Sequence, residues 1–469
     1  MMIKEAAIII AVLFPIIGAF ILPLLGRRSK TLRNRSALFL AVASCLSSLV
    51  LLFTVSAGGT FRFWFFQVDP LAVFMALVSS FIGAVIVLYS FDYIDHYDNQ
   101  DEYYLMVLLF LGSMMGLVYA RNLIALYVFW ELTAIASWRL IGFYRGPSDV
   151  LKADKAFLIT VFGSLLMLFA FVGIYLSAGT LDLGQLSGQI LSDGLVVLIL
   201  AGILAKSATL PFHTWLPDAG VAPSPVTALL HAAVLVKIGV YVYARLFLAT
   251  FIVSSFWTGA VPALAAVSAL VAAGAALVET DIKRIIAYST VSQIAFIFLG
   301  LATGNLIGVV GGMLYILMHG LAKGGLFLAA GIIEQNTRTK DITKMGGLIK
   351  TMPLTAVAFL GCILSVMGVP PFGGFFSKYL VVAAAVQNGQ WPIALTFVIG
   401  AFLTILYLFR LFTLIFLGEP KGIPAKESSK RMVYCVALLA VLSLAGGLLI
   451  NFPFNYLQAT LACLPGVTR

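Results

Sequence analysis

The sequence predicts an all-α membrane protein with about fourteen transmembrane helices. Of its 469 residues, 62% are hydrophobic and only 10% carry a charged side chain, whereas a soluble domain has roughly 25% charged residues. Apolar runs long enough to cross a bilayer, roughly 17–25 residues each, recur along the whole chain between short polar segments. Lipid must therefore be the solvent for most of the surface, and only helices or closed barrels satisfy their backbone groups there.

The predicted spans follow one another within a single membrane domain that covers residues 1–469. The first span runs straight into Arg27 and Arg28 without a small-residue cleavage signal, so it is predicted to be retained and not to be a signal peptide. In order, the spans are 5–25, 36–56, 69–91, 103–120, 122–143, 156–177, 191–210, 225–249, 256–278, 285–303, 305–333, 353–387, 391–417 and 432–452.

The distribution of lysine and arginine predicts the orientation of the chain. Basic residues gather in the cytoplasmic loops of membrane proteins, and with both termini outside the inside loops hold most of them. The inside loop 92–102 is acidic, but acidic residues contribute little to this rule. We therefore expect a multi-pass protein of the cell (inner or cytoplasmic) membrane. The basic residues of the inside loops are Arg27, Arg28, Lys30, Arg33, Arg35, Arg145, Lys152, Lys155, Lys283, Arg284, Arg338, Lys340, Lys344, Lys350, Lys421, Lys426, Lys430 and Arg431.

The basic balance and the cysteines exclude several function classes. The net charge of +10 does not indicate nucleic-acid binding, because the basic residues lie in short loops and not in a stripe with stacking aromatic side chains. The four cysteines form no CxxC pair, so the chain alone predicts neither a zinc site nor an iron–sulfur site. A dinucleotide-binding fingerprint is also missing. We expect no cofactor and no metal in this chain.

Two of the spans contain sequences that break helices. Residues 204–225 include four prolines, and residues 368–380 contain Pro370 and Pro371 followed by two glycines. Proline removes a backbone donor and clashes with the preceding turn, so unwound backbone is expected at membrane depth, where protein or water must cover it. Paired interruptions of this kind indicate inverted repeats with an ion path between them, although simple packing kinks are the alternative.

Ionisable residues inside the predicted spans are the main functional signal. Each buried charge costs at least about 2.5–3.5 kcal/mol on insertion scales, and a purely structural bundle has no reason to accumulate several. For Arg410 and Arg245, near helix ends, snorkelling to the interface is an equal alternative. The other ionisable residues are Glu131, Lys206, Lys237, Lys323 and Lys378, accompanied by His231 and His319.

These residues predict a row of protonatable groups. A lysine held between desolvation and a nearby carboxylate changes protonation readily, so a small movement of Glu131 would load or unload a proton at Lys206. Histidine can relay protons near neutral pH, and His319 shares one helix face with Lys323, four residues on. Satisfied, buried histidines are the alternative reading. His213, beside the first break, would serve an entry path or only cap freed backbone groups.

At these positions the chain resembles the antiporter-like subunits of respiratory complex I (the L, M and N type), which are shared with Mrp cation/proton antiporters and membrane-bound group 4 hydrogenases. The likeness covers roughly residues 65–420, and its longest motif is LAKSATLPFHTWLPDAGVAPSPVTALLHAAVLVKIGVYVYARL. The motifs that carry it lie at 130–143, 204–246, 281–296, 318–331 and 368–380.

The resemblance implies a fourteen-helix fold with two inverted five-helix repeats and broken helices, the first repeat at about 103–249 and the second at about 256–417. Glu131 and Lys206 look like the family's Glu–Lys pair on the fifth and seventh helices, and Lys237 like the connecting lysine on the eighth. His319 looks like the central histidine near a break in the eleventh helix, and Lys378 like the terminal lysine on the twelfth. Arg139 occupies a position that is usually apolar in the family, and the sequence gives no account of it.

Three functional hypotheses follow. The first is a proton-translocating, non-redox membrane subunit of a complex I-like or group 4 hydrogenase-type oxidoreductase, with iron–sulfur clusters, flavin or a nickel–iron site in its partner subunits. The second is a subunit of a Mrp-type multisubunit sodium/proton antiporter without redox activity. A scaffold subunit that has lost transport is the third. Other membrane subunits of the same family are expected partners in the bilayer, and the choice between proton and sodium stays open.

Overall fold

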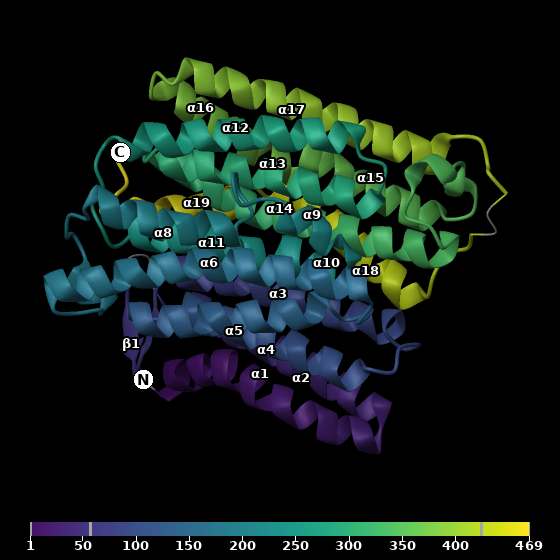
Figure 1. The fold of residues 1–469 in the computed structure, drawn as a ribbon, viewed down its shortest axis with the longest axis horizontal. Coiled ribbons are helices and arrows are strands. Elements are labelled where there is room, and N and C mark those ends of the chain that lie inside the picture. The colour runs from purple at the N-terminus through teal and green to yellow at the C-terminus, as the bar shows by residue number, and fades with distance from the viewer. Residues whose placement is uncertain (1, 56–58, 423–424, 469) are drawn as a thin grey trace. The chain divides into compact units, whose positions relative to one another are not determined.

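The computed structural model describes residues 2–55, 59–422 and 425–468, so the terminal residues 1 and 469 lie outside the described chain. Helices make up almost all of it (Figure 1). Within the described residues, twelve helices are long and apolar enough to cross a membrane. The prediction of an all-α polytopic membrane protein is confirmed at this level. The count of about fourteen spans and the two inverted repeats stay predictions.

The chain divides into two compact units. The first, unit 1, comprises Met1–Ser207, Ala233–Ser254 and Ala459–Val467. In Figure 1, α1 and α2 lie side by side at the purple end of the colour scale. The elements of unit 1 are α1 (Met2–Arg28), α2 (Lys30–Thr54), β1 (Phe61–Phe63), β2 (Phe66–Val68), α3 (Pro70–Tyr93), α4 (Gln100–Val118), α5 (Leu123–Ile141), α6 (Pro147–Ala178), α7 (Leu183–Leu186), α8 (Asp193–Lys206), α11 (Leu235–Tyr243) and η3 (Ala244–Leu248).

The second, unit 2, comprises Ala208–Ala232, Ser255–Gln458 and Thr468–Arg469. Two further elements, η2 (Leu229–Ala233) and α19 (Asn451–Leu461), belong to both units along the chain. The elements of unit 2 are α9 (Trp215–Asp218), η1 (Ala219–Val221), α10 (Ser224–Ala228), α12 (Trp257–Val278), α13 (Ile282–Ala302), α14 (Leu306–Thr337), η4 (Ile342–Lys344), η5 (Leu348–Lys350), α15 (Pro353–Met367), α16 (Gly373–Gln387), α17 (Trp391–Phe412), η6 (Thr413–Leu417) and α18 (Lys430–Leu448).

Helix starts follow local capping chemistry. Asp69 accepts a hydrogen bond from the Ala72 backbone and begins α3 with a proline in its first turn, and Asn122 caps α5 in the same way. Such side chains satisfy amide groups that have no partner inside the helix. A small antiparallel hairpin, β1–β2, precedes α3 and pairs Phe61 with Val68. This hairpin departs from the purely helical prediction.

Both predicted breaks are confirmed. Helix α8 ends at Lys206, and the chain passes through short turns before α10 begins at Ser224. Helix α15 ends at Met367 and α16 begins at Gly373, so the single span predicted at 353–387 is two helices of 15 residues each. The prolines prevent a continuous hydrogen-bond ladder at both places.

The eleventh helix departs from what the resemblance implies. A break was expected near His319, but α14 runs as one α-helix of 32 residues from Leu306 to Thr337. No proline occurs in that stretch of sequence, so nothing local interrupts the ladder. The irregular backbone lies instead at η2, a π-helical turn, and at Val234 (φ −129°, ψ −74°) directly after it. Such π turns are frequent at functional sites.

Candidate functional site

The Glu131 and Lys206 side chains come together in unit 1. Lys206 is the last residue of α8 and is fully buried. Its Nζ donates to the Trp130 carbonyl at 3.1 Å and lies 5.3 Å from the centroid of the Trp130 ring. Glu131, the next residue of α5, is half-buried and interacts electrostatically with Lys206. The pair expected from the sequence is therefore formed in space.

The Glu131 carboxylate retains unused capacity. Its Oε1 atom is buried and makes no hydrogen bond to any residue that the structure describes. A buried acceptor in that state is satisfied by water or by a proton. The position of this oxygen, close to a buried ammonium, is what a proton-exchanging site requires.

Lys237 lies on α11, which packs directly on the end of α8. Lys237 is fully buried. A Cβ on Gly239 would lie 2.1 Å from the Ser207 Oγ and 2.6 Å from the Ile203 carbonyl oxygen, so the two backbones are as close as a glycine allows. This contact holds the helix of Lys237 against the end of the helix that carries Lys206.

A second group of buried cations lies in unit 2. Lys378 on α16 is 6% exposed, donates from Nζ to the Val366 carbonyl at 2.7 Å and faces the Phe296 ring at 4.7 Å. Lys323 on α14 is fully buried and donates to the Ile286 carbonyl at 3.1 Å. The two lysines interact electrostatically. Backbone carbonyls, which are bound without a counter-ion, hold both ammonium groups.

The two histidines of this group occupy different surroundings. The His319 ring lies 5.9 Å from that of Tyr315, whose hydroxyl donates to Gln293 at 2.6 Å. His231 stacks at 4.3 Å on Phe327 and interacts electrostatically with Lys323. Neither ring nitrogen of His231 makes a hydrogen bond within the described part of the chain. His213, in the first break, is half-buried.

Lys378 also borders a cavity of about 560 Å³ in unit 2. The other side chains around it are largely apolar, and several of them come from α16 and α17. They are Phe296, Met367, Phe375, Tyr379, Val382, Val386 and Val398, among others. Unlike Lys323, this lysine is therefore bordered by open space.

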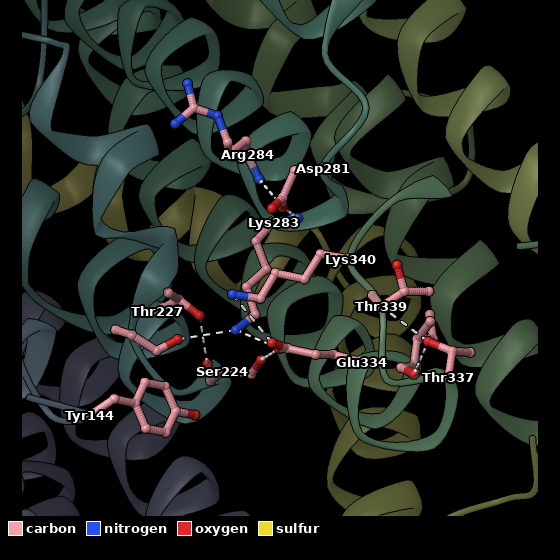
Figure 2. Close-up of polar contacts among 12 residues, drawn as sticks. Tyr144, Ser224, Thr227, Asp281, Lys283, Arg284, Glu334, Thr337, Thr339 and Lys340 are labelled. Carbon is pink, nitrogen blue, oxygen red and sulfur yellow. Dashed lines mark hydrogen bonds and ion pairs between the residues drawn. The ribbon is translucent and has the colours of Figure 1, made fainter. Parts of the chain in front are cut away.

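An ion-pair cluster at the ends of α13 and α14 was not predicted. Figure 2 shows Glu334 between Lys283 and Lys340, with Ser224 beside it. Lys283 is 1% exposed, pairs with Glu334 at 2.6 Å and donates to the Ala222 carbonyl at 3.0 Å. The cluster ties the first break to two helix ends. Sequence analysis counted Lys283 as a loop residue and placed Glu334 just beyond a span.

Two arginines also differ from expectation. Arg245 does not snorkel: it is 5% exposed and forms a two-pronged pair with Asp69 at 2.6 and 2.8 Å. Arg139 and Arg145 both pair with Glu102 at one end of unit 1. Arg139 is thereby explained as part of a helix-end ion pair. Over residues 2–55, 59–422 and 425–468, no group of three or more His, Cys, Asp or Glu side chains is placed to hold a metal ion.

Comparisons with known proteins place these residues in context. Residues 120–404 match the family described as NADH:quinone oxidoreductase/Mrp antiporter, and residues 59–104 match the chain 5 N-terminus of NADH-ubiquinone oxidoreductase (complex I). The chain is 33% identical, over 94% of its length, to the A1 subunit of the Na(+)/H(+) antiporter of Staphylococcus haemolyticus. It is 37% identical, over 68% of its length, to the A-type member of the Na(+)/H(+) antiporter of Alkalihalophilus pseudofirmus. It spans about 60% of the first of these relatives and 42% of the second.

Two solved structures share the fold. One is the Mrp complex from Dietzia sp. DQ12-45-1b, with a TM-score of 0.90 at 24% identity over 99% of this chain and 98% of the other. The second is the membrane-bound sulfane sulfur reductase, an archaeal respiratory membrane complex, with a TM-score of 0.88 at 25% identity over 98% and 97%.

Proposed function

The chain belongs to the family of membrane subunits shared by NADH:quinone oxidoreductase and the Mrp antiporters, and from this we propose that it translocates protons as a subunit of a Mrp-type sodium/proton antiporter. The relatives named as antiporter subunits favour this reading over the oxidoreductase reading that came first from the sequence. The protonatable groups are Glu131, Lys206 and Lys237 in unit 1, and His319 and Lys378, with Lys323, His231 and His213, in unit 2.

One observation carries the proposal: a fully buried Lys206 ammonium is held by a backbone carbonyl and influenced by a half-buried carboxylate. A buried charge costs at least about 2.5–3.5 kcal/mol, and a membrane potential supplies about 2.3 kcal/mol per charge per 100 mV. Because the two energies are similar, the ion gradient is large enough to change the protonation of such a group. Loading and unloading at Lys206 is then coupled to the position of Glu131.

Lysines favour protons as the ion carried by these residues. An ammonium group has three donors and no acceptor, so it cannot coordinate sodium. In this proposal sodium passes through another part of the complex. The other membrane subunits of that complex are the partners, in the cell membrane, with both termini of this chain outside.

A redox-driven complex is the second candidate, and the likeness to the sulfane sulfur reductase complex favours it. In that case the chain is the ion-translocating subunit of an oxidoreductase. Iron–sulfur clusters, flavin or a nickel–iron site would then lie in partner subunits. The two candidates differ in the energy source and not in the residues of this chain.

Transport by the reconstituted complex tests the proposal. Lys206→Ala and Glu131→Gln are expected to slow proton movement by about tenfold or more, since each removes one member of the exchanging pair. Lys350→Ala, on the exposed end of η5, is the matched control and should transport normally. If both site variants assemble and transport like the control, the proposal is wrong. Proton movement driven by a sodium gradient without an electron donor separates the antiporter from the redox-driven complex.

A further inference from the structure

A cavity of about 320 Å³ opens at one end of unit 1. It lies where the loop before β1, the start of α3, α7, the end of η3 and the C-terminal segment meet. The distribution of lysine and arginine over the loops places this end outside the membrane. The polar lining of the cavity includes Arg62, Gln67, Asp69, Arg245, Thr250 and Cys463.

The cavity ends on the buried ion pair of Asp69 and Arg245. Besides its two bonds to Asp69, the guanidinium donates to the Tyr241 hydroxyl at 2.8 and 3.0 Å. The Tyr241 hydroxyl donates in turn to the Val118 carbonyl at 2.5 Å. The pair therefore separates the cavity from the interior of unit 1, and the separating groups are all polar.

One helix face leads from this ion pair to the buried lysines. Lys237, Tyr241 and Arg245 follow one another at intervals of four residues on α11 and η3. Residues spaced in this way lie above one another on one face of a helix. The same face thus carries a buried ammonium at one end and the floor of the cavity at the other.

The cavity is suited to hold water. At about 30 Å³ per water molecule in the liquid, it has room for about ten. The Gln67 Oε1 atom is buried beside it and makes no hydrogen bond to another described residue. Buried polar atoms of this kind bind ordered water. Water at this position would connect Asp69 with the solvent.

We propose that this cavity is the outlet through which unit 1 releases protons, and that the Asp69–Arg245 pair is its gate. The inference rests on the proposed function. In one release event, an Nζ–H bond of protonated Lys237 breaks and the proton passes, when the pair opens, to cavity water. Lys237 is left as a neutral amine and is reloaded from Lys206.

Cys463, which lines the cavity and is exposed, allows a direct test. Cys362 and Cys435 are buried and Cys45 is half-buried in a spanning helix. The reconstituted complex is treated from the outside with a membrane-impermeant thiol reagent that carries a trimethylammonium group. A fixed positive charge at the outlet should slow proton transport by about tenfold. Treated and untreated vesicles of Cys463→Ser should transport at equal rates.

The gate is tested by Asp69→Asn, with Asp182→Asn as the matched control. Asp182 pairs with Arg121 at 2.7 Å at the same end of unit 1, outside the cavity lining. We expect Asp69→Asn to slow transport by about tenfold, while Asp182→Asn stays within about twofold. Equal losses in the two variants would show that the Asp69 pair is structural and would overturn the gate.

Lys237→Ala, measured in parallel, separates this inference from the proposed function. If Cys463 is fully modified without any change in rate while Lys237→Ala slows transport, the outlet lies elsewhere and the proposed function stands. A reagent effect that persists in Cys463→Ser also overturns the outlet. If Lys206→Ala and Lys237→Ala both transport normally, the proposed function itself fails.

Discussion

Replacing Glu334 with glutamine should destabilise unit 2 more than replacing its partner Lys283 with methionine. Glu334→Gln leaves the Lys283 ammonium, only 1% exposed, without its counter-charge. Removing one partner of a buried pair costs about 3–5 kcal/mol. In Lys283→Met, the Glu334 carboxylate still has Lys340 at 3.3 Å and is 20% exposed. That variant should therefore cost only about 1–3 kcal/mol.

The difference of about 2 kcal/mol can be measured from the free energy of unfolding of the purified chain, titrated with SDS and followed by circular dichroism. Lys340→Met is the control and should cost about 0–1 kcal/mol, because this lysine is 32% exposed. The double variant at 283 and 334 should be more stable than Glu334→Gln alone. If Glu334→Gln costs no more than Lys283→Met, the buried ammonium does not depend on this carboxylate and the reasoning is wrong.

Three further predictions concern other parts of the chain. Gly239→Ala should cost about 1–3 kcal/mol, because the new Cβ meets the α8 backbone at 2.6 Å, whereas Gly274→Ala, with open space around it, should unfold like the parent protein. Arg139→Gln should leave proton transport within about twofold, and a large loss in the transport assay would place Arg139 in the ion path. Burial alone would raise the pKa of Glu279, but hydrogen bonds from Arg284 and from backbone amides outweigh it and hold the pKa below its usual value. The stability that Glu279 contributes is thus complete above about pH 4.3 and is lost as the pH falls further; in unfolding measurements over this range, Glu279→Gln should lack that component.

Much of the fold could be predicted because lipid makes a strong demand on sequence. Each long apolar run became a helix, and both proline-rich breaks occur where proline removes a backbone donor. The β1–β2 hairpin was missed because strands of three residues are too short to show an alternating pattern. The break implied near His319 failed because it was transferred from a resemblance and had no local signal in the sequence.

The site could be predicted only as far as buried charge reveals it. Lys206 and Glu131 stood out because ionisable residues inside spans are costly. The pairing of Asp69 with Arg245 could not be foreseen, since 176 positions separate them along the chain and no local pattern links them. Glu334 lay just beyond a predicted span, where a charge needs no explanation. Partners of this kind emerge only when helices distant in sequence meet.

The cavity beside Lys378 has a practical consequence for the choice of preparation. Its mostly apolar walls are suited to a detergent tail or an acyl chain as much as to a neighbouring helix. A hydrocarbon tail in that space would keep water from the Lys378 amine, whereas a polar group from a neighbour would solvate it. The same chain would then exchange protons at different rates in a micelle and in its native assembly.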